Sequence, residues 1–231
     1  MYHSVIISGK NTFDEWGLVP KTRPLVNPPE VKETYMELPA ADGMLDYTDL
    51  LMGRAPYGQR TGFWEFVVRP GKRWVEVYTS ILNYLHGKSH RVILEDDPDF
   101  FYSGRLTVNR WKSDAKYSVI AIGYNLDPFR ESVTASDDRD WLWNDLFNTT
   151  IRYGSFTVNG EKYRTLINRG LQPTTPVFYC SSPMTVAFNG ATYSLVTGMN
   201  RNENLALQLG DNVMVFSGSG NVTVSYREMA L

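Results

Sequence analysis

The chain has 231 residues, of which 42% are hydrophobic and 13% aromatic, and its formal net charge is −2. That length accommodates one large β domain or two smaller ones, and the charge argues against the basic surface of a nucleic-acid-binding protein. The single cysteine, Cys180, excludes an internal disulfide bond, and no apolar run approaches the roughly 18 residues of a membrane-spanning helix. We therefore expect a soluble protein that folds in a reducing cytosol, with Cys180 as a buried, inert thiol.

Strands predominate in the first 70 residues, and one helix follows them. Apolar or alternating runs that end at glycine, proline or polar residues predict strands at residues 4–8, 34–38 and 63–68. A single apolar stripe then recurs at helical spacing, formed by Trp74, Tyr78, Ile81, Leu82 and Leu85. It predicts an amphipathic helix with His86 in its last turn and Gly87 just after its end.

A strand, a turn and a β-hairpin are predicted after this helix. Residues 91–94 form the strand, and Asp97-Pro98-Asp99 has the composition of a solvated turn. Residues 101–112 and 116–126 are two long strand-like segments separated by Ser113-Asp114. This arrangement predicts a hairpin.

The composition of the chain changes near residue 130. Residues 130–140 are polar and charged, and Trp141, Trp143 and Phe147 interrupt the segment that follows. We interpret residues 130–148 as a linker between two domains, at 1–129 and 149–231. A long loop within one domain is the alternative.

Short strands and turn signals alternate after residue 149. Strand-like runs occur at 156–158, 185–188, 192–195, 205–209, 213–216 and 222–226, and turns are predicted at Asn159-Gly160, Asn189-Gly190, Gly210-Asp-Asn212 and Gly218-Ser-Gly220. Strands at this spacing predict an antiparallel β-sandwich or jelly roll. The predicted fold class is therefore mainly β, with one packed α-helix in the N-terminal part.

No group of residues indicates a catalytic or metal site. The four carboxylates within residues 95–99 lack the spacing of a calcium loop, and a solvated turn explains them better. His3, His86 and His90 do not combine with cysteine or carboxylates at zinc-binding spacing, and no Gly-x-Ser-x-Gly motif is present. We predict no enzymatic activity, no cofactor and no bound metal.

The loop at residues 49–60 is the strongest candidate for a functional surface. Gly53 and Gly58 have the spacing of a phosphate-binding loop, but Gln59 and Arg60 stand where that loop needs lysine and a hydroxyl residue. A strand follows in place of a helix. The loop is therefore interpreted as a protein-binding segment and not as a nucleotide site.

Four stretches carry a resemblance to a known family. They are Asp49-Leu-Leu-Met-Gly-Arg-Ala-Pro-Tyr-Gly-Gln-Arg60 with its following strand, the helix and the residues after it at 74–105, residues 108–129, and the C-terminal residues 218–228. Together with the aromatic segment at 140–147, their order and spacing resemble the distal tail proteins of long-tailed, non-contractile bacteriophages or prophages.

The resemblance implies a β-rich N-terminal domain that forms a hexameric ring and a C-terminal galectin-like β-sandwich. The ring would be a hub that joins the tail tube to the baseplate or tail tip, and DNA would pass through it without specific binding. The implied partners are the tail tube protein, a tail-tip or tail-associated protein and a receptor-binding protein. The implied location is the tail tip of the virion, after assembly in the bacterial cytoplasm, with no membrane insertion, no cofactor and no enzymatic activity.

A closed ring uses a heterologous interface, in which one surface of each subunit meets a different surface of the next. Pro56 and the closely spaced glycines restrict the 49–60 loop, Arg54 and Arg60 can bond carboxylates in a bidentate manner, and Tyr57 offers a rigid anchor. Arg54, Tyr57 and Arg60 are therefore the candidate site residues. Whether they contact the neighbouring subunit or brace the loop within their own chain is open.

Two other functions are alternatives. A lectin-like module could recognise saccharides through exposed aromatic side chains of the C-terminal part, for which the candidates are Trp141, Trp143, Phe178, Tyr179 and Tyr193. A glycosidase or peptidoglycan hydrolase would need a catalytic constellation, and the sequence contains none that we recognise.

Overall fold

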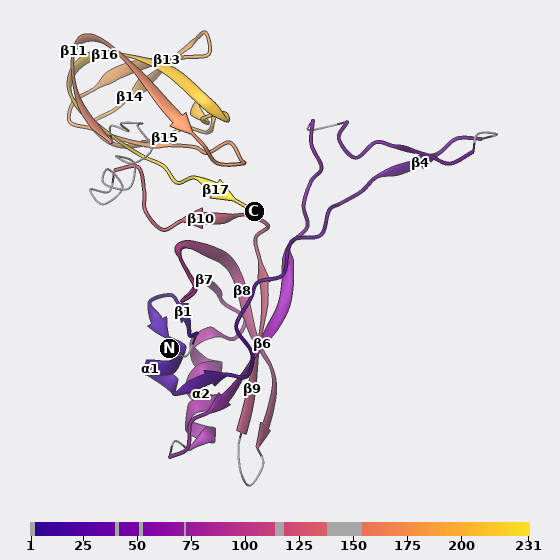
Figure 1. Ribbon diagram of the computed structural model, residues 1–231. Coiled ribbons are helices and arrows are strands. Elements are labelled where there is room, and N and C mark those ends of the chain that lie inside the picture. Colours follow the sequence, from indigo (N-terminus) through magenta and orange to yellow (C-terminus); the bar gives the residue numbers. More distant parts are fainter. Residues whose placement is uncertain (1–2, 40–41, 51–52, 72, 114–117, 138–153) are drawn as a thin grey trace. The chain divides into compact units, whose positions relative to one another are not determined.

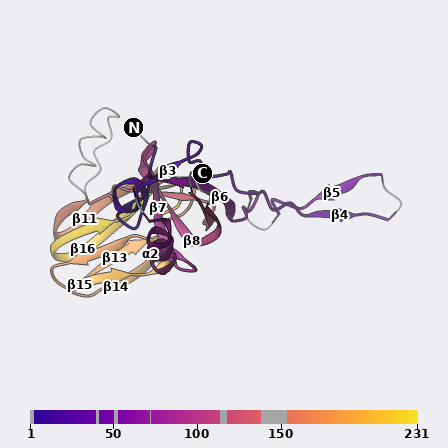
Figure 2. The ribbon, with the colours of Figure 1, turned by 90° about the horizontal axis from the view of Figure 1, so that it is seen from below.

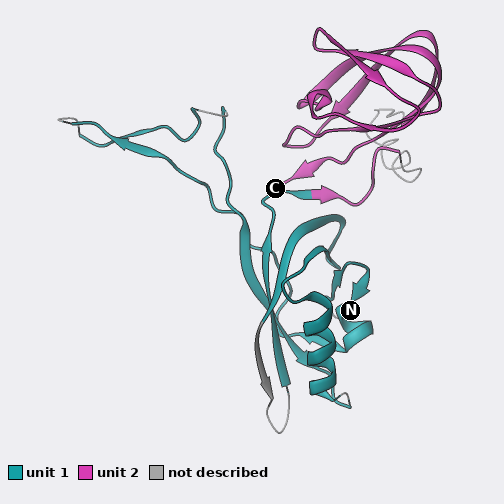
Figure 3. Cartoon of the chain, turned by 180° about the vertical axis from the view of Figure 1, so that it is seen from behind, with its two compact units in different colours: residues 1–130 teal, residues 131–231 magenta. Residues whose placement is uncertain are grey.

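The structure is a computed structural model that describes residues 3–39, 42–50, 53–71, 73–113, 118–137 and 154–231, without the side chains of 109–113. The chain divides into two compact units, Met1–Arg130 and Glu131–Leu231 (Figure 3). Each unit has its own apolar core, and the predicted mainly β fold class is confirmed. The linker predicted at 130–148 lies largely outside the described residues, so its boundaries stay a prediction.

Unit 1 is built on an antiparallel sheet with the strand order β2-β1-β7-β8-β9-β6-β3. Figure 1 labels its strands β1, β7, β8, β9 and β6. Its strands are β1 (Val5–Ile7), β2 (Lys10–Asn11), β3 (Leu18–Pro20), β6 (Arg60–Val68), β7 (Ser89–Leu94), β8 (Asp97–Ser113) and β9 (Ser118–Leu126). The predicted hairpin is confirmed as β8 and β9, which pair from Gly104 opposite Leu126 to Ser113 opposite Ser118.

The predicted helix is confirmed as α2 (Trp74–Leu85). Its residues Val77, Ile81 and Leu85 are buried in the core of unit 1, together with the inward-facing side chains of β6, β8 and β9. Gly87 follows the helix with a positive φ of 71°, and its N–H donates to the carbonyl of Leu106 at 2.8 Å. The helix therefore covers one face of the sheet and ends where glycine allows the chain to turn.

A second, short helix, α1 (Thr12–Trp16), was not predicted. The Asn11 side chain accepts hydrogen bonds from the N–H groups of Phe13 and Asp14, and Gly17 ends the helix in the left-handed region. Both capping signals are visible in the sequence. The helix was missed because five residues are too few to show an amphipathic period.

The prediction of a solvated turn at Asp97-Pro98-Asp99 is wrong. The turn lies at Glu95 and Asp96, and β8 already begins at Asp97. The carboxylates of Glu95, Asp96 and Asp97 are also hydrogen-bonded. Glu95 accepts hydrogen bonds from the backbone and the side chain of Ser4. Asp96 forms ion pairs with His3 and Arg23, and Asp97 forms one with Arg130. The partners of these carboxylates lie far away in the sequence, so no local sequence pattern predicts the hydrogen bonds.

Unit 2 is a curled antiparallel sheet around a second core (Figure 2). Its strands are β11 (Ser155–Asn168), β12 (Val177–Cys180), β13 (Met184–Phe188), β14 (Ala191–Leu195), β15 (Gly198–Arg201) and β16 (Gly210–Ser225). The short strands β10 (Arg130–Ser132) and β17 (Met229–Ala230) pair with each other and lie outside this sheet. Along one side β16 pairs with β11 throughout. Along its other side β16 pairs first with β13 and then with β12, so the long β11–β16 pair connects the strands on which one core is built.

Four turn or strand predictions in unit 2 are wrong. Gly210-Asp-Asn212 forms the start of β16 and not a turn, because these residues pair with the end of β11. Gly218-Ser-Gly220 and Asn159-Gly160 lie inside the continuous strands β16 and β11, where Gly160 is paired with Gly218. Residues 205–209 form no strand, because a short 3₁₀ helix, η1 (Glu203–Leu205), precedes an irregular segment. The turn at Asn189-Gly190 is confirmed between β13 and β14.

Candidate assembly surface

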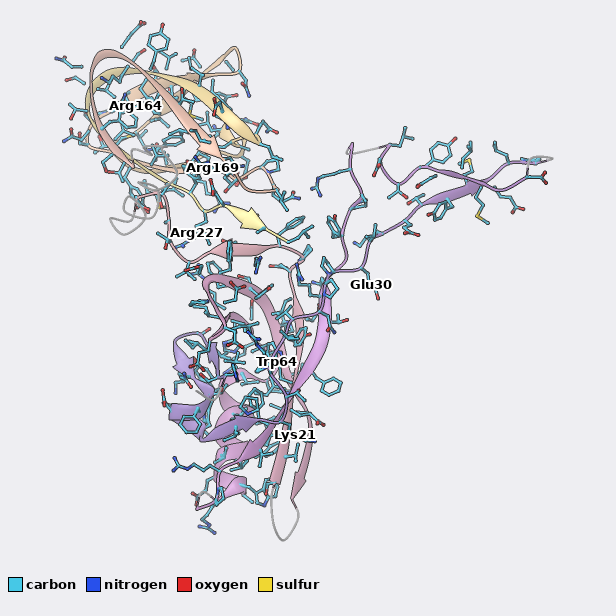
Figure 4. The ribbon with its side chains drawn as sticks, in the orientation of Figure 1. Lys21, Glu30, Trp64, Arg164, Arg169 and Arg227 are labelled. Carbon is cyan, nitrogen blue, oxygen red and sulfur yellow. The ribbon has the colours of Figure 1, made fainter. Side chains whose placement is uncertain are left out.

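The 49–60 loop forms one side of the base of a long extension that projects from the sheet of unit 1. The N–H of Lys32 donates to the carbonyl of Pro56 at 2.8 Å, the N–H of Gly58 donates to the carbonyl of Glu30 at 2.7 Å, and Val31 and Tyr57 form a β-bridge. Residues 30–32 are therefore fixed to residues 56–58. We call residues 30–50, which extend from this base, the arm; Figure 4 labels Glu30, where it leaves the unit.

Arg60 is buried, with 5% of its surface exposed, although it carries a charge. Its Nε donates to the carbonyl of Pro128 at 2.8 Å, and its Nη1 donates to the carbonyl of Asn27 at 2.9 Å. Its guanidinium also lies over the ring of Tyr102, and burial lowers the pKa of Arg60. Arg60 thus joins three segments of its own chain, which is the arrangement of a bracing residue.

Arg54 and Tyr57 meet on a single aromatic ring. The rings of Tyr57 and Phe129 are 5.7 Å apart at an angle of 84°, and the guanidinium carbon of Arg54 lies 5.8 Å from the Phe129 ring centre. Both side chains are half-buried. The candidate residues are therefore brought together around the segment 127–130, where they support the base of the arm.

A short segment beside β6 strengthens the same base. The Trp64 indole N–H donates to the carbonyl of Leu25, and the Asn27 side-chain amide donates to the carbonyl of Thr61, each at 2.8 Å. Trp64 also lies against the ring of Tyr124, 4.5 Å away between centres (Figure 4 labels Trp64). These two hydrogen bonds hold residues 25–27, which precede the arm, against strand β6, which follows it.

The arm itself contains an isolated β-hairpin. Strands β4 (Tyr35–Glu37) and β5 (Met44–Asp46) form a separate two-stranded sheet, in which Met36 pairs with Leu45 (Figures 1 and 2). Every described residue of these strands is exposed. A two-stranded hairpin with nothing packed against it has little stability of its own in water.

The hairpin is amphipathic in spite of this exposure. Directly opposed residues share a face in an antiparallel pair, so Met36 and Leu45 lie on one face, while Tyr35 with Asp46 and Glu37 with Met44 lie on the other. Met36 is 52% exposed and Leu45 is 45% exposed. One face of the hairpin is therefore aliphatic and uncovered, and the other is partly acidic.

The arm is also strongly acidic. Between residues 30 and 50 there are six acidic residues and one lysine, a net charge of −5. The rest of unit 1, residues 1–29 and 51–130, has fifteen basic and ten acidic residues, a net charge of +5. The two charges cancel over unit 1 as a whole, so its net charge does not reveal their separation.

The described residues also bear on three other features: a metal site, a reactive cysteine and a membrane-spanning helix. No group of three or more His, Cys, Asp or Glu residues among the described positions could hold a metal ion. Cys180 is buried, and burial raises the pKa of its thiol, which disfavours the reactive thiolate. In the described parts of the chain, no helix is long and apolar enough to cross a membrane.

Three of the aromatic residues proposed for saccharide stacking are described, and they differ in exposure. Phe178 is fully buried, and Tyr193 packs against the core of unit 2. Of these three, Tyr179 is the exposed one, at 45%, while Trp141 and Trp143 lie outside the described residues.

Comparison with known proteins identifies the fold. No protein-family model matches the chain, and no curated protein matches its sequence. Among solved structures, the crystal structure of SPP1 Dit (gp 19.1) matches 100% of both chains with a TM-score of 0.65 and 12% sequence identity. The chain has the Dit fold. SPP1 Dit is described as a paradigm of the hub adsorption apparatus in phages that infect Gram-positive bacteria, and at this identity the shared feature is the fold.

Proposed function

We propose that this protein is a structural component of a phage or prophage tail, a distal tail hub without enzymatic activity. Six copies form a ring that joins the tail tube to the baseplate or tail tip, and DNA passes through the centre. The C-terminal unit is a galectin-like sandwich that supports other tail-tip proteins. The Dit fold over the full length and the resemblance of the 49–60 and 74–129 stretches support this role.

The observation that carries the proposal is the uncovered aliphatic face of the arm. An aliphatic side chain such as Met36 or Leu45 gains about 1.5–3 kcal/mol when it moves from water to a buried site. In a monomer Met36 and Leu45 are exposed on a hairpin that has little stability of its own, whereas assembly would bury both side chains. The braced base at Arg60 and Phe129 then fixes the direction in which the arm is presented.

The experiment is a comparison of assembly by the wild-type chain and the double variant Met36→Ser with Leu45→Ser. Sedimentation velocity should show a six-copy species for the wild type and its loss in the variant. The matched control is Val196→Ser, which changes a side chain of similar exposure (62%) in unit 2 and should leave the ring intact. A wild-type protein that stays monomeric at high concentration would contradict the proposal.

A further inference from the structure

The outward face of unit 2 carries a row of side chains that crosses four strands. Directly paired residues lie on the same face of a sheet, and the register pairs Tyr179 on β12 with Met199 on β15 and with Thr223 on β16. Strand β11 extends the row from Thr223 and adds a second polar pair two residues along. We call this set the unit 2 patch; its members are Ser155, Thr157, Tyr179, Met199, Asn221 and Thr223.

The unit 2 patch is exposed and uncharged. Met199 is 68% exposed and Tyr179 is 45% exposed, whereas Phe178, the neighbour of Tyr179 in β12, is buried in the core. Arg201 follows Met199 two residues along β15, and it already forms an ion pair with Glu203 at 3.2 Å. The patch therefore combines two apolar side chains with neutral hydroxyl and amide groups.

Two hydrogen bonds hold the polar groups of the patch in place. The hydroxyl of Thr157 donates to Oδ1 of Asn221 at 2.7 Å, and the hydroxyl oxygens of Ser155 and Thr223 lie 2.9 Å apart. The amide N–H donors of Asn221 have no partner in the described part of the chain. An amide that is already oriented loses little conformational entropy when it donates to a ligand.

These groups fit a neutral sugar better than a polyanion or a protein. The face of an aromatic ring carries partial negative charge and attracts the C–H groups on one side of a sugar ring, while amides and hydroxyls bond the sugar's hydroxyl groups. A phosphate-bearing polymer would need unpaired cations, and the patch contains no basic residue. A protein interface needs about 800 Å² on each partner with an apolar centre, and the patch exposes two apolar side chains.

We propose that the unit 2 patch binds a neutral oligosaccharide that carries N-acetyl groups. A sugar ring lies on Tyr179, the methyl of its N-acetyl group contacts Met199, and its oxygen atoms accept hydrogen bonds from Asn221. Neighbouring strands are about 4.8 Å apart, so the four-strand row spans roughly 14 Å, enough for about two or three linked sugar rings. The site belongs to unit 2 alone and does not depend on ring formation.

Isothermal titration calorimetry of the full-length protein tests the site. The probe is triacetylchitotriose, a trimer of N-acetylglucosamine, and the comparison is maltotriose, a glucose trimer without acetyl groups. We expect the wild type to bind triacetylchitotriose with a Kd below about 1 mM and maltotriose at least about tenfold more weakly. Met199→Ala should reduce this preference, because the acetyl methyl group loses its contact.

The tyrosine ring supplies the sharpest comparison of variants. Tyr179→Ala should weaken binding of triacetylchitotriose at least about tenfold, and Tyr179→Phe, which keeps the ring, should bind like the wild type. Tyr163→Ala is the matched control, because Tyr163 is another exposed tyrosine of unit 2, at 64%, and lies outside the patch. Thermal unfolding of each variant verifies that it is folded.

Three results would overturn the proposal. No binding of either trimer by the folded wild type at millimolar concentration removes the site, and so does equal weakening by Tyr179→Ala and Tyr163→Ala. Equal affinity of the wild type for the two trimers removes the N-acetyl specificity and the role of Met199. The proposed ring is measured separately by sedimentation velocity, so the two proposals stand or fall independently.

Discussion

At the scale of single residues, the base of the arm depends on a buried charge that is satisfied by carbonyl oxygens. Arg60 donates to Pro128 and Asn27 from a site that is 5% exposed. Hydrogen bonds from a charged donor contribute more than neutral ones, and their loss leaves buried carbonyls without partners. Arg60 was singled out from sequence for its charge, yet its role follows from partners 33 and 68 residues away, which no local pattern reveals.

Replacement of Arg60 by methionine should therefore destabilise the protein. Methionine keeps most of the aliphatic volume but loses both hydrogen bonds, and we expect a loss of about 2–4 kcal/mol in the free energy of unfolding. Urea unfolding measures it. Arg73→Met, whose side chain is 85% exposed, serves as the control and should change stability by less than about 0.5 kcal/mol. Equal effects of the two substitutions would remove the bracing role of Arg60.

The turn between β7 and β8 gives unit 1 a dependence on pH. Hydrogen bonds from the backbone and hydroxyl of Ser4 lower the pKa of Glu95, and the contacts of Asp96 with His3 and Arg23 lower the pKa of Asp96. A carboxyl whose folded pKa is lowered stabilises the fold above its unfolded pKa and loses that contribution as pH falls through the folded value.

Stability should accordingly decrease as the pH falls below about 4.5, the usual pKa of a glutamate. The variant Glu95→Gln should be less stable than the wild type at pH 7, and the difference should shrink when both are measured near pH 3. Thermal unfolding at the two pH values makes the comparison. A difference that is the same at both pH values would show that the Glu95 carboxylate does not act in this way.

At the scale of elements, paired glycines shape unit 2. Gly218 has a φ of 150°, and an added Cβ there would lie 2.7 Å from the Cβ of Met184. Gly218 pairs with Gly160 at the point where β16 leaves β13 for β12. The same glycines predicted turns from sequence, because a local reading cannot distinguish a chain reversal from a close approach between strands.

Gly218→Ala should destabilise unit 2 by about 1–3 kcal/mol, because the new methyl group meets Met184 and the backbone conformation is strained. Ser219→Ala changes the exposed residue next to it and should be nearly neutral. Chemical denaturation of both variants checks this. Similar stabilities would mean that the strand absorbs the methyl group without strain.

The helix and the arm show opposite limits of sequence analysis. Helix α2 was predicted with its ends, because a twelve-residue apolar stripe followed by Gly87 has one interpretation. The strand in the arm was also predicted, but its lack of support was not, since periodicity cannot show whether an apolar face has a partner in the same chain. That missing partner is the feature on which the proposed assembly depends.

At the scale of the whole molecule, the fold class could be predicted from the sequence, whereas the surface through which copies would assemble stays a proposal. The mainly β fold follows from strand patterns and turn residues, and the Dit fold agrees with the resemblance drawn from the sequence. The structure places Arg54 and Tyr57 against Phe129 at the base of the arm, whereas Met36 and Leu45 on the arm are exposed, and a role of Arg54, Tyr57 and Arg60 in assembly stays a prediction. Interfaces between copies are encoded by surfaces that meet only after folding.

We expect the separation of charge within unit 1, with −5 on the arm and +5 on the rest, to make the proposed assembly sensitive to salt. Charges at the edge of an interface are screened by salt, with a Debye length of about 10 Å at 0.1 M. We expect the ring to dissociate at a higher protein concentration when sodium chloride is raised from 0.05 to about 0.5 M, because salt weakens the attraction between opposite charges. Sedimentation equilibrium across this range measures the effect, and an affinity that rises steadily with salt would indicate a purely apolar contact.

The central claim is that this chain is a ring-forming hub. Electron microscopy of the purified wild-type protein, with two-dimensional class averages, tests it most directly. The account predicts closed rings of six subunits with a central opening, and their absence from the variant Met36→Ser with Leu45→Ser. Isolated single subunits in every preparation of the wild type, at any concentration tested, would contradict it.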